Sequence, residues 1–323
     1  MRNVRWTLFA LLLCAAVSRT EAGDVKSTML KKGLPAKLTV NVKDQDGRPV
    51  SDAEVMFCFV RYNIEEPNTV IVKTGANGTA TGEANANRCV VLHLTKEGYY
   101  SSFVEYGLWG SGKGYETGRW EPWNPTLDIT MYPKINRRQA PKFRSCYYEH
   151  LEQNVAYGFD MLEKDIVPPG RKEETADFQF KGNGQKIIIS CENQMGSMKI
   201  YFTNSLDVIF QNNGDGVIKM KKHEDSEFKF TYLAPETGYM QRLQLYEDFS
   251  PQRPEGKGEP FLSDKEYLIF RISRIDEKSG ETKRYYGIIT RLSGTADLAG
   301  KRDFEIAYYL NPDPEDRNIE YGP

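Results

Sequence analysis

The stretch LTVNVKDQDGRPVSDAEVMFCFV, residues 38–60, followed by TGANGTATGEANANRCVVLHLTKEGYY, residues 74–100, decides the fold of the first part of the chain. Its opening segment, Leu38–Val42, alternates apolar and polar side chains, which predicts a strand with one buried face. The Asp46-Gly47 pair predicts a tight turn, because glycine adopts a positive φ without steric cost. Further strands are expected at 53–60, 79–81 and 89–94, so this part of the chain is expected to form a small β-sandwich.

Three short motifs in this stretch carry a family resemblance. The pattern D-x-D-G-x-P-V-x-x-A-x-V at Asp44–Val55, then T-G-x-N-G at Thr74–Gly78 and K-x-G-Y at Lys96–Tyr99, resembles the carboxypeptidase-regulatory-like, or transthyretin-like, β-sandwich. Immunoglobulin-like bacterial repeats share the first motif. The resemblance covers about residues 35–133 and implies a non-catalytic module with no active site to carry over.

Two later motifs extend the resemblance to the rest of the chain. They are W-x-P-W-N-P-T at Trp120–Thr126 and G-F-D-x-x-x-x-D-x-V-P-P-G at Gly158–Gly170. Together with the sandwich, they resemble uncharacterised exported bacterial proteins. This resemblance implies architecture and localisation only.

The N-terminal residues have the features of an export signal. Arg2 and Arg5 precede the apolar run Trp6–Val17, and Thr20-Glu21-Ala22 offers a cleavage site, so residues 1–22 are expected to be a signal peptide. Ordinary secretion is favoured over a lipoprotein at Cys14, because lipoprotein processing requires a small residue before the cysteine. We therefore expect a periplasmic, cell-surface or secreted protein, with no integral membrane segment after cleavage.

Length and charge narrow the function classes. The chain has 323 residues and 39% hydrophobic content, enough for two packed domains, and its formal net charge is −2. No strongly basic face is evident, so nucleic acid is not expected as a partner.

The expected organisation is a signal peptide 1–22, a sandwich 23–133, a linker 134–144, a second β-rich domain 145–310 of sandwich or jelly-roll type, and a polar tail 311–323. The predicted fold class is all-β.

Four cysteines remain after the expected cleavage. Cys58 and Cys89 both alternate away from the predicted core, which favours a disulfide between them on the outer face of one sheet. Cys146 and Cys191 would then pair within the second domain, and the alternative is free thiols. No CxxC or HxxxH spacing occurs, so we expect neither a metal site nor a cofactor.

An aromatic, glycine-rich insertion, Gly107–Pro125, is the first candidate binding site. It holds Trp109, Tyr115, Trp120 and Trp123. Exposed tryptophan and tyrosine stack on sugar rings or anchor protein interfaces. The alternative is that these side chains are buried where the two domains meet.

The remaining candidates have simpler explanations. Asp160, Glu163 and Asp165 could serve acid–base chemistry or Ca²⁺, but as turn and cap residues they need no such role. The run Asn212–Gly216 is expected to be a hairpin turn.

No catalytic motif is found. The prediction is an exported, non-catalytic binding or structural protein that contacts a polysaccharide or another protein. The alternative is a secreted hydrolase with its site in the second domain.

Overall fold

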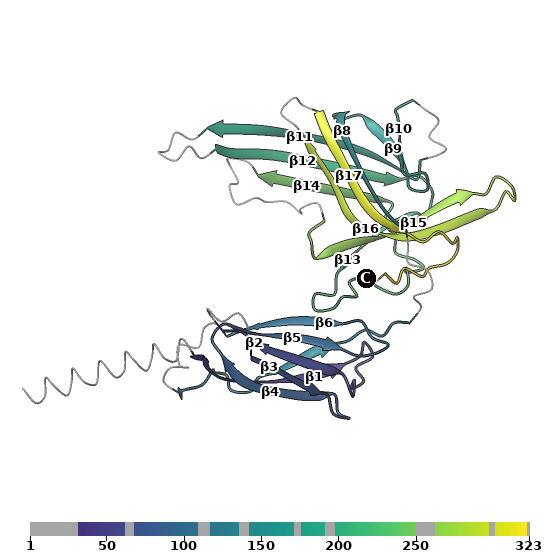
Figure 1. The fold of residues 1–323 in the computed structure, drawn as a ribbon. Helices are drawn as coiled ribbons and strands as arrows, with labels where there is room; N and C mark the ends of the chain where they lie inside the picture. The colour runs from purple at the N-terminus through teal and green to yellow at the C-terminus, as the bar shows by residue number, and fades with distance from the viewer. Residues whose placement is uncertain are drawn as a thin grey trace, which may run out of the picture. The chain divides into compact units, whose positions relative to one another are not determined.

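The computed structural model describes residues 32–61, 68–108, 117–135, 142–170, 176–190, 198–249, 262–296 and 301–321. The chain divides into two compact units. Unit 1 consists of Met1–Lys134 together with Asp225–Phe228, and unit 2 consists of Ile135–Glu224 together with Lys229–Pro323. Nearly all regular structure is β-strand, which confirms the predicted all-β fold class (Figure 1).

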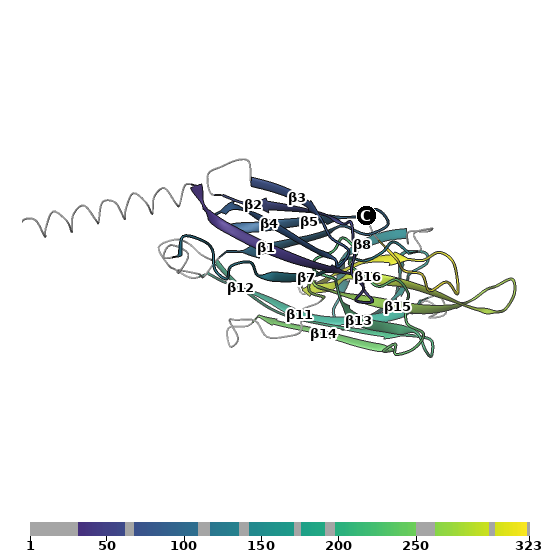
Figure 2. The same cartoon turned by 90° about the horizontal axis from the view of Figure 1, so that it is seen from below.

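Unit 1 is a sandwich of two sheets, a three-stranded sheet in the order β4-β1-β7 and a four-stranded sheet in the order β3-β2-β5-β6. Strand β7 runs parallel to β1, and the other pairs are antiparallel. Figures 1 and 2 show the strands of each sheet running side by side. The strands are β1 (Leu34–Lys43), β2 (Glu54–Phe59), β3 (Asn68–Lys73), β4 (Thr79–Ala86), β5 (Cys89–Thr95), β6 (Ser102–Gly107) and β7 (Thr126–Thr130).

The core of unit 1 follows the alternation that the sequence predicts. Leu38, Val40 and Val42 on β1 are buried, while the residues between them are partly exposed. Phe57 on β2 lies under Gly82 on β4, where a Cβ atom would come within 2.5 Å of the phenyl ring. The close approach of these two sheets therefore requires a glycine at position 82.

Unit 2 is a larger sandwich of two five-stranded sheets, in the orders β10-β9-β11-β12-β14 and β13-β15-β16-β17-β8. One core cluster, which includes Phe178, Phe270 and Phe304, fills the space between them. The strands are β8 (Lys142–Glu152), β9 (Ala156–Asp160), β10 (Asp165–Val167), β11 (Phe178–Ser190), β12 (Met198–Phe210), β13 (Gly216–Lys221), β14 (Arg242–Phe249), β15 (Glu266–Ile275), β16 (Thr282–Ala296) and β17 (Lys301–Leu310).

The C-terminal segment is part of the fold of unit 2. Ile319 is fully buried, its N–H donates to the Tyr232 carbonyl at 2.9 Å, and it belongs to a second core cluster with Tyr267 and Ile269 of β15. Residues 311–321, expected as a polar tail, therefore cover one face of a sheet. Strand β8 also begins at Lys142, inside the expected linker.

One local prediction is corrected. The run Asn212–Gly216 is not a hairpin turn, because β12 and β13 belong to different sheets, so it carries the chain from one sheet to the other. Asp215 fixes this crossover, since its buried carboxylate accepts hydrogen bonds from the backbone N–H of Ser273 at 2.7 Å and from its hydroxyl at 2.6 Å. Two such bonds suit a buried carboxylate that would otherwise lack hydration.

Candidate functional site

The described parts of the predicted aromatic insertion are Gly107–Leu108 and Thr117–Pro125, and the second is here called the tryptophan segment. Trp109 and Tyr115 lie outside the described residues. Trp120 is an anchor of this segment: its backbone N–H donates to the Pro35 carbonyl at 2.9 Å and its indole Nε1 donates to the Ala86 carbonyl at 2.7 Å. The Trp120 ring packs against the core of unit 1. The structure therefore gives Trp120 a stabilising role.

Trp123 lies half-buried between charged side chains. The Arg119 guanidinium lies 4.9 Å from the Trp123 ring centroid, and the Lys37 ammonium lies 5.9 Å from it. Both distances suit cation–π attraction. Trp123 is therefore a half-buried indole with two cations over its ring.

Glu121 fixes this arrangement. Its Oε1 accepts from Arg119 Nε at 2.9 Å, and its Oε2 accepts the backbone N–H of Trp123 at 2.8 Å. The hydrogen bond from Arg119 holds the pKa of Glu121 below its ordinary value. On the other side, Asn124 Oδ1 accepts from the Thr39 hydroxyl at 2.8 Å. The segment is thus held to β1 and is preorganised around Trp123.

A small cavity of about 60 Å³ lies beside the tryptophan segment. Lys37 and Glu121 supply its charged side chains. Because a water molecule occupies about 30 Å³ in the liquid, the cavity has room for the tip of one aliphatic side chain. The apolar part of its wall is formed by Ala36, Leu38, Val90, Tyr106, Pro122 and Pro125.

The predicted disulfide between Cys58 and Cys89 is wrong, since both thiols are free. Cys58 pairs with Val91 across β2 and β5, so Cys89 is its diagonal neighbour. Diagonal neighbours lie roughly 7–8 Å apart, too far for a disulfide, whose Cβ atoms are roughly 3.5–4.5 Å apart. Burial, aided by the carboxylate of Glu105, raises the pKa of the Cys89 thiol to about 11.

The second predicted pair has only one described member. Cys146 on β8 is a free, buried cysteine, and burial raises the pKa of its thiol. Cys191 lies outside the described residues. Among the residues that the structure describes, no group of three or more His, Cys, Asp or Glu side chains could hold a metal ion.

Of the three candidate carboxylates in unit 2, Asp160 is buried, and Glu163 and Asp165 are exposed. Asp160 ends β9, and Asp165 begins β10 directly opposite it, so the two residues flank a hairpin turn. Asp160 Oδ1 caps this turn by accepting the N–H groups of Leu162 and Glu163, both at 2.9 Å.

A buried ion cluster, which sequence reasoning missed, underlies this hairpin. Arg274 of β15 donates to Asp177 through two bonds of 2.6 and 2.8 Å and contacts Asp160 at 2.9 Å. Burial raises the pKa of Asp177 to about 6, more than its bonds from Arg274 lower it. Burial alone would lower the pKa of Arg274, but the two carboxylates more than offset this and raise it. The Arg274 guanidinium therefore keeps its positive charge between the two carboxylates.

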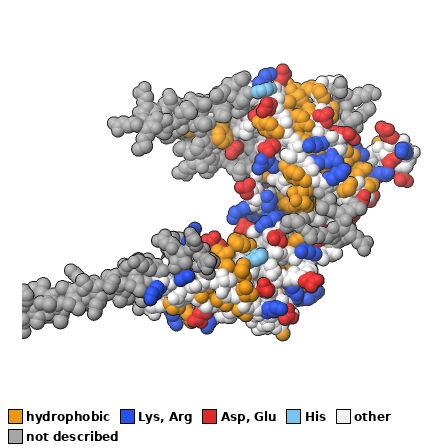
Figure 3. Space-filling model, viewed as in Figure 1, with side chains coloured by type: hydrophobic (Ala, Val, Ile, Leu, Met, Phe, Trp, Pro, Cys, Tyr) orange, Lys and Arg blue, Asp and Glu red, His pale blue; other side chains and the backbone are white. Residues whose placement is uncertain are grey.

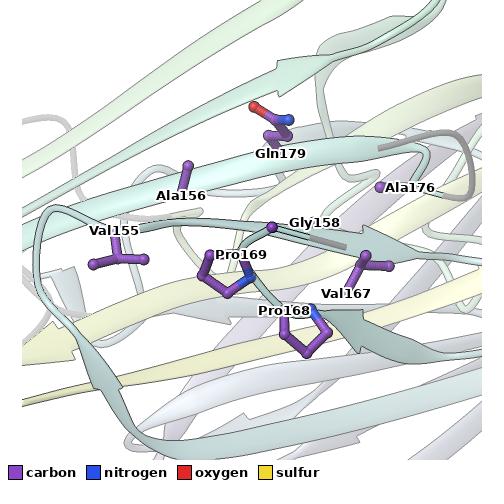
Figure 4. A pocket seen from close by; sticks show the side chains of 9 residues that line it. Val155, Ala156, Gly158, Val167, Pro168, Pro169, Ala176 and Gln179 are labelled. Atoms are coloured by element: carbon purple, nitrogen blue, oxygen red, sulfur yellow. The ribbon is translucent and has the colours of Figure 1, made fainter. Parts of the chain in front are cut away.

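A hollow of about 270 Å³ lies near the same hairpin, beside Pro168 and Pro169 (Figure 4). Gly158 of β9 is covered by its neighbours, because a Cβ atom there would come within 2.7 Å of the Ala176 side chain and 3.0 Å of Val167. Gln179 supplies the only side-chain hydrogen-bonding group among the described residues that line it. These walls offer apolar contact and little acid–base chemistry.

The wider surface is mixed in character. Figure 3 shows hydrophobic, acidic and basic side chains interspersed over the viewed face. Large exposed hydrophobic side chains include Ile71 and Phe103 in unit 1 and Tyr147 and Ile275 in unit 2. Among the described residues, no helix is long and apolar enough to cross a membrane.

Comparison with known proteins gives little further information. No protein-family model matches the chain, and no curated protein matches it. Several solved structures show weak similarity, three of which are described. A 3-chlorocatechol 1,2-dioxygenase from Rhodococcus opacus 1CP is 15% identical over 32% of this chain and 62% of its own, with a TM-score of 0.24. A catechol 1,2-dioxygenase from Acinetobacter sp. ADP1 is 11% identical over 32% of this chain and 54% of its own, with a TM-score of 0.24.

A streptococcal ancillary pilin is 9% identical over 65% of this chain and 62% of its own, with a TM-score of 0.20. The chain therefore spans less than two thirds of the length of each of these proteins. Scores and identities this low carry no argument about fold or function.

Proposed function

We propose that the chain is an exported, non-catalytic binding protein of the cell envelope or extracellular space, and that it holds a protein partner at the tryptophan segment. The observation that carries this proposal is the setting of Trp123. A half-buried indole, flanked by Arg119 and Lys37, is fixed in place by Glu121 beside a small apolar cavity. Tryptophan and arginine are the residues that most often dominate protein-binding energy.

The geometry favours a protein over a polysaccharide. Sugar binding by tryptophan requires a bare ring face, and Arg119 and Lys37 already lie over the Trp123 ring. A cavity of about 60 Å³ suits the tip of an aliphatic side chain. An interface of this type, with an apolar centre and a charged rim, matches the anatomy of protein–protein contacts.

The buried acids of unit 2 support a binding role over the alternative of a hydrolase. Asp160 and Asp177 are held by Arg274, and Asp215 is held by Ser273. A catalytic carboxylate must reach a substrate proton within hydrogen-bond distance. These three carboxylates instead satisfy groups of the protein interior.

The test is a selection from a random peptide display library on the immobilised mature chain, run beside an array of soluble polysaccharides. Enriched peptides are then bound to Trp123→Ala and to Ile71→Ala, a matched loss of an exposed hydrophobic side chain in the same unit. We expect peptides that require Trp123 and tolerate Ile71→Ala. Polysaccharide binding that requires Trp123, with no such peptide, would contradict the choice of partner. Indifference of every ligand to Trp123→Ala would refute the site.

Export is tested separately. We expect residues 1–22 to direct secretion of a fused reporter and the exported chain to begin at Gly23 on N-terminal sequencing. Retention of the reporter inside the cell would contradict the proposed localisation.

A further inference from the structure

Four residues far along the sequence complete a sheet of unit 1. Asp225–Phe228 belong to unit 1, and Ser226 forms an antiparallel bridge with Ser102 of β6. The Phe103 N–H donates to the Asp225 carbonyl at 2.9 Å, and the Glu227 N–H donates to the Ser101 carbonyl at 2.9 Å. These bonds and the isolated bridge hold Asp225–Phe228, here called the cis segment, along the edge of the four-stranded sheet. This geometry is strand addition, a common mode of peptide recognition.

An aromatic anchor holds the cis segment. Phe228 is fully buried, and its ring stacks on Tyr100 with centroids 4.9 Å apart and planes inclined by 15°. Tyr132 closes a second side at 5.6 Å. The Lys134 ammonium lies 5.4 Å from the Tyr100 ring. Unit 1 therefore provides an aromatic pocket at the end of a strand-pairing edge, the arrangement that gives a peptide site both affinity and side-chain selectivity.

Two further contacts select the residues before the anchor. Ser226 is buried, and its hydroxyl accepts the Phe228 N–H at 3.1 Å, which shapes the bend that directs the aromatic ring inward. Glu227 Oε2 accepts the Ser101 N–H at 3.2 Å. The segment that fills the site thus carries a small hydroxyl residue, a carboxylate and an aromatic residue in succession.

The edge of β6 continues beyond the part that these residues cover. In an antiparallel pair, successive N–H groups point alternately to opposite sides of the strand. Phe103 donates outward to Asp225, so Glu105 and Gly107 direct their N–H groups to the same edge. The chain turns away at Glu224, whose carbonyl accepts from Lys229 Nζ at 2.9 Å. A longer strand would find further donors there.

We propose that the β6 edge and the Tyr100–Tyr132 pocket form a strand-binding site for extended peptides that carry a serine–acidic–aromatic sequence. In this chain, Asp225–Phe228 occupy the site in cis. When they leave it, the site accepts the same kind of segment in trans. This site is separate from the tryptophan segment and does not depend on the function proposed for that segment.

The test uses the full mature chain with Phe228→Ala, which removes the anchor from the cis segment. The probe is a fluorescent peptide of residues 221–231, KKHEDSEFKFT, read by anisotropy, with amide hydrogen exchange at Phe103 as the second readout. We expect saturable binding to Phe228→Ala at least tenfold tighter than to the unaltered chain. The peptide should restore protection of the Phe103 amide, and its own Phe228→Ala version should bind at least tenfold more weakly.

A second variant covers the case in which Phe228→Ala fails to fold. Glu227→Ala removes the side-chain bond from the Ser101 N–H, and it leaves the backbone bond to the Ser101 carbonyl and the anchor in place. It should speed exchange of the Ser101 and Phe103 amides at least threefold and admit the peptide more readily than the unaltered chain. Equal peptide binding by the unaltered chain and both folded variants, or equal binding of the peptide that lacks phenylalanine, would overturn the proposal.

Discussion

Replacing Arg274 with methionine should destabilise unit 2 strongly, because it leaves two buried carboxylates without their cation. The Asp177 side chain is 0% exposed, that of Asp160 is 9% exposed and that of Arg274 is 22% exposed. Removing one partner of a buried ion pair costs about 3–5 kcal/mol. With an m value of about 2 kcal/mol/M, the urea midpoint of unit 2 should fall by about 2 M.

Arg242→Met is the matched control. Arg242 also donates two hydrogen bonds to one aspartate, Asp207, at 2.8 and 2.6 Å, but the side chains are 56% and 28% exposed. Solvent screens such a pair, so its loss should move the midpoint by less than a third of the shift from Arg274→Met.

The assay can separate the two units. All four tryptophans lie within Met1–Lys134, so tryptophan emission follows unit 1. Far-ultraviolet circular dichroism follows both units. Arg274→Met should shift the dichroism transition and leave the tryptophan transition in place. Equal shifts from Arg274→Met and Arg242→Met would refute the reasoning, because burial would then not decide the strength of these pairs.

Three further predictions rest on single contacts. Burial raises the pKa of Asp177 from 3.8 to about 6, so its contribution to stability should fall by about 2 kcal/mol as pH rises from 4 to 6. Urea titrations of Asp177→Asn should lack this fall relative to the unaltered chain, and parallel curves would contradict it. Trp120→Ala should destabilise unit 1 by about 3 kcal/mol, because core packing and the bond to Ala86 are lost. Thermal melts should show a larger loss of stability than for Trp123→Ala. The reverse order would be inconsistent with the anchoring role of Trp120. Gly287→Ala should destabilise unit 2 by about 2 kcal/mol, since its Cβ atom would collide with the Tyr309 carbonyl and the Phe270 ring; an unchanged urea midpoint would show that the sheet adjusts.

The local pattern of the sequence predicted the strands of unit 1 well where one face is buried. Leu38, Val40 and Val42 reveal their strand because buried and exposed positions alternate with the pleat. Strand β3 (Asn68–Lys73) was missed, although Val70 and Val72 alternate in the same way. Residues Glu227–Tyr232 also alternate polar and aromatic side chains, but they form no strand.

Features that depend on distant partners could not be predicted. Asp177 and Arg274 lie 97 positions apart, and nothing near either residue marks them as a pair. The disulfide prediction failed for a related reason: the side-chain parity of Cys58 and Cys89 could be read from the strands, but their pairing register could not. Sheet order and register are set by the whole chain, so long-range electrostatic contacts are visible only in the structure.

The most direct test of the proposed function is a calorimetric titration of a selected peptide into the mature chain and into its Trp123→Ala and Ile71→Ala variants. We predict that Trp123→Ala weakens binding at least tenfold, equivalent to about 1.4 kcal/mol, while Ile71→Ala changes it less than twofold. Equal affinities for the unaltered chain and Trp123→Ala would contradict the assignment of the tryptophan segment as the binding site.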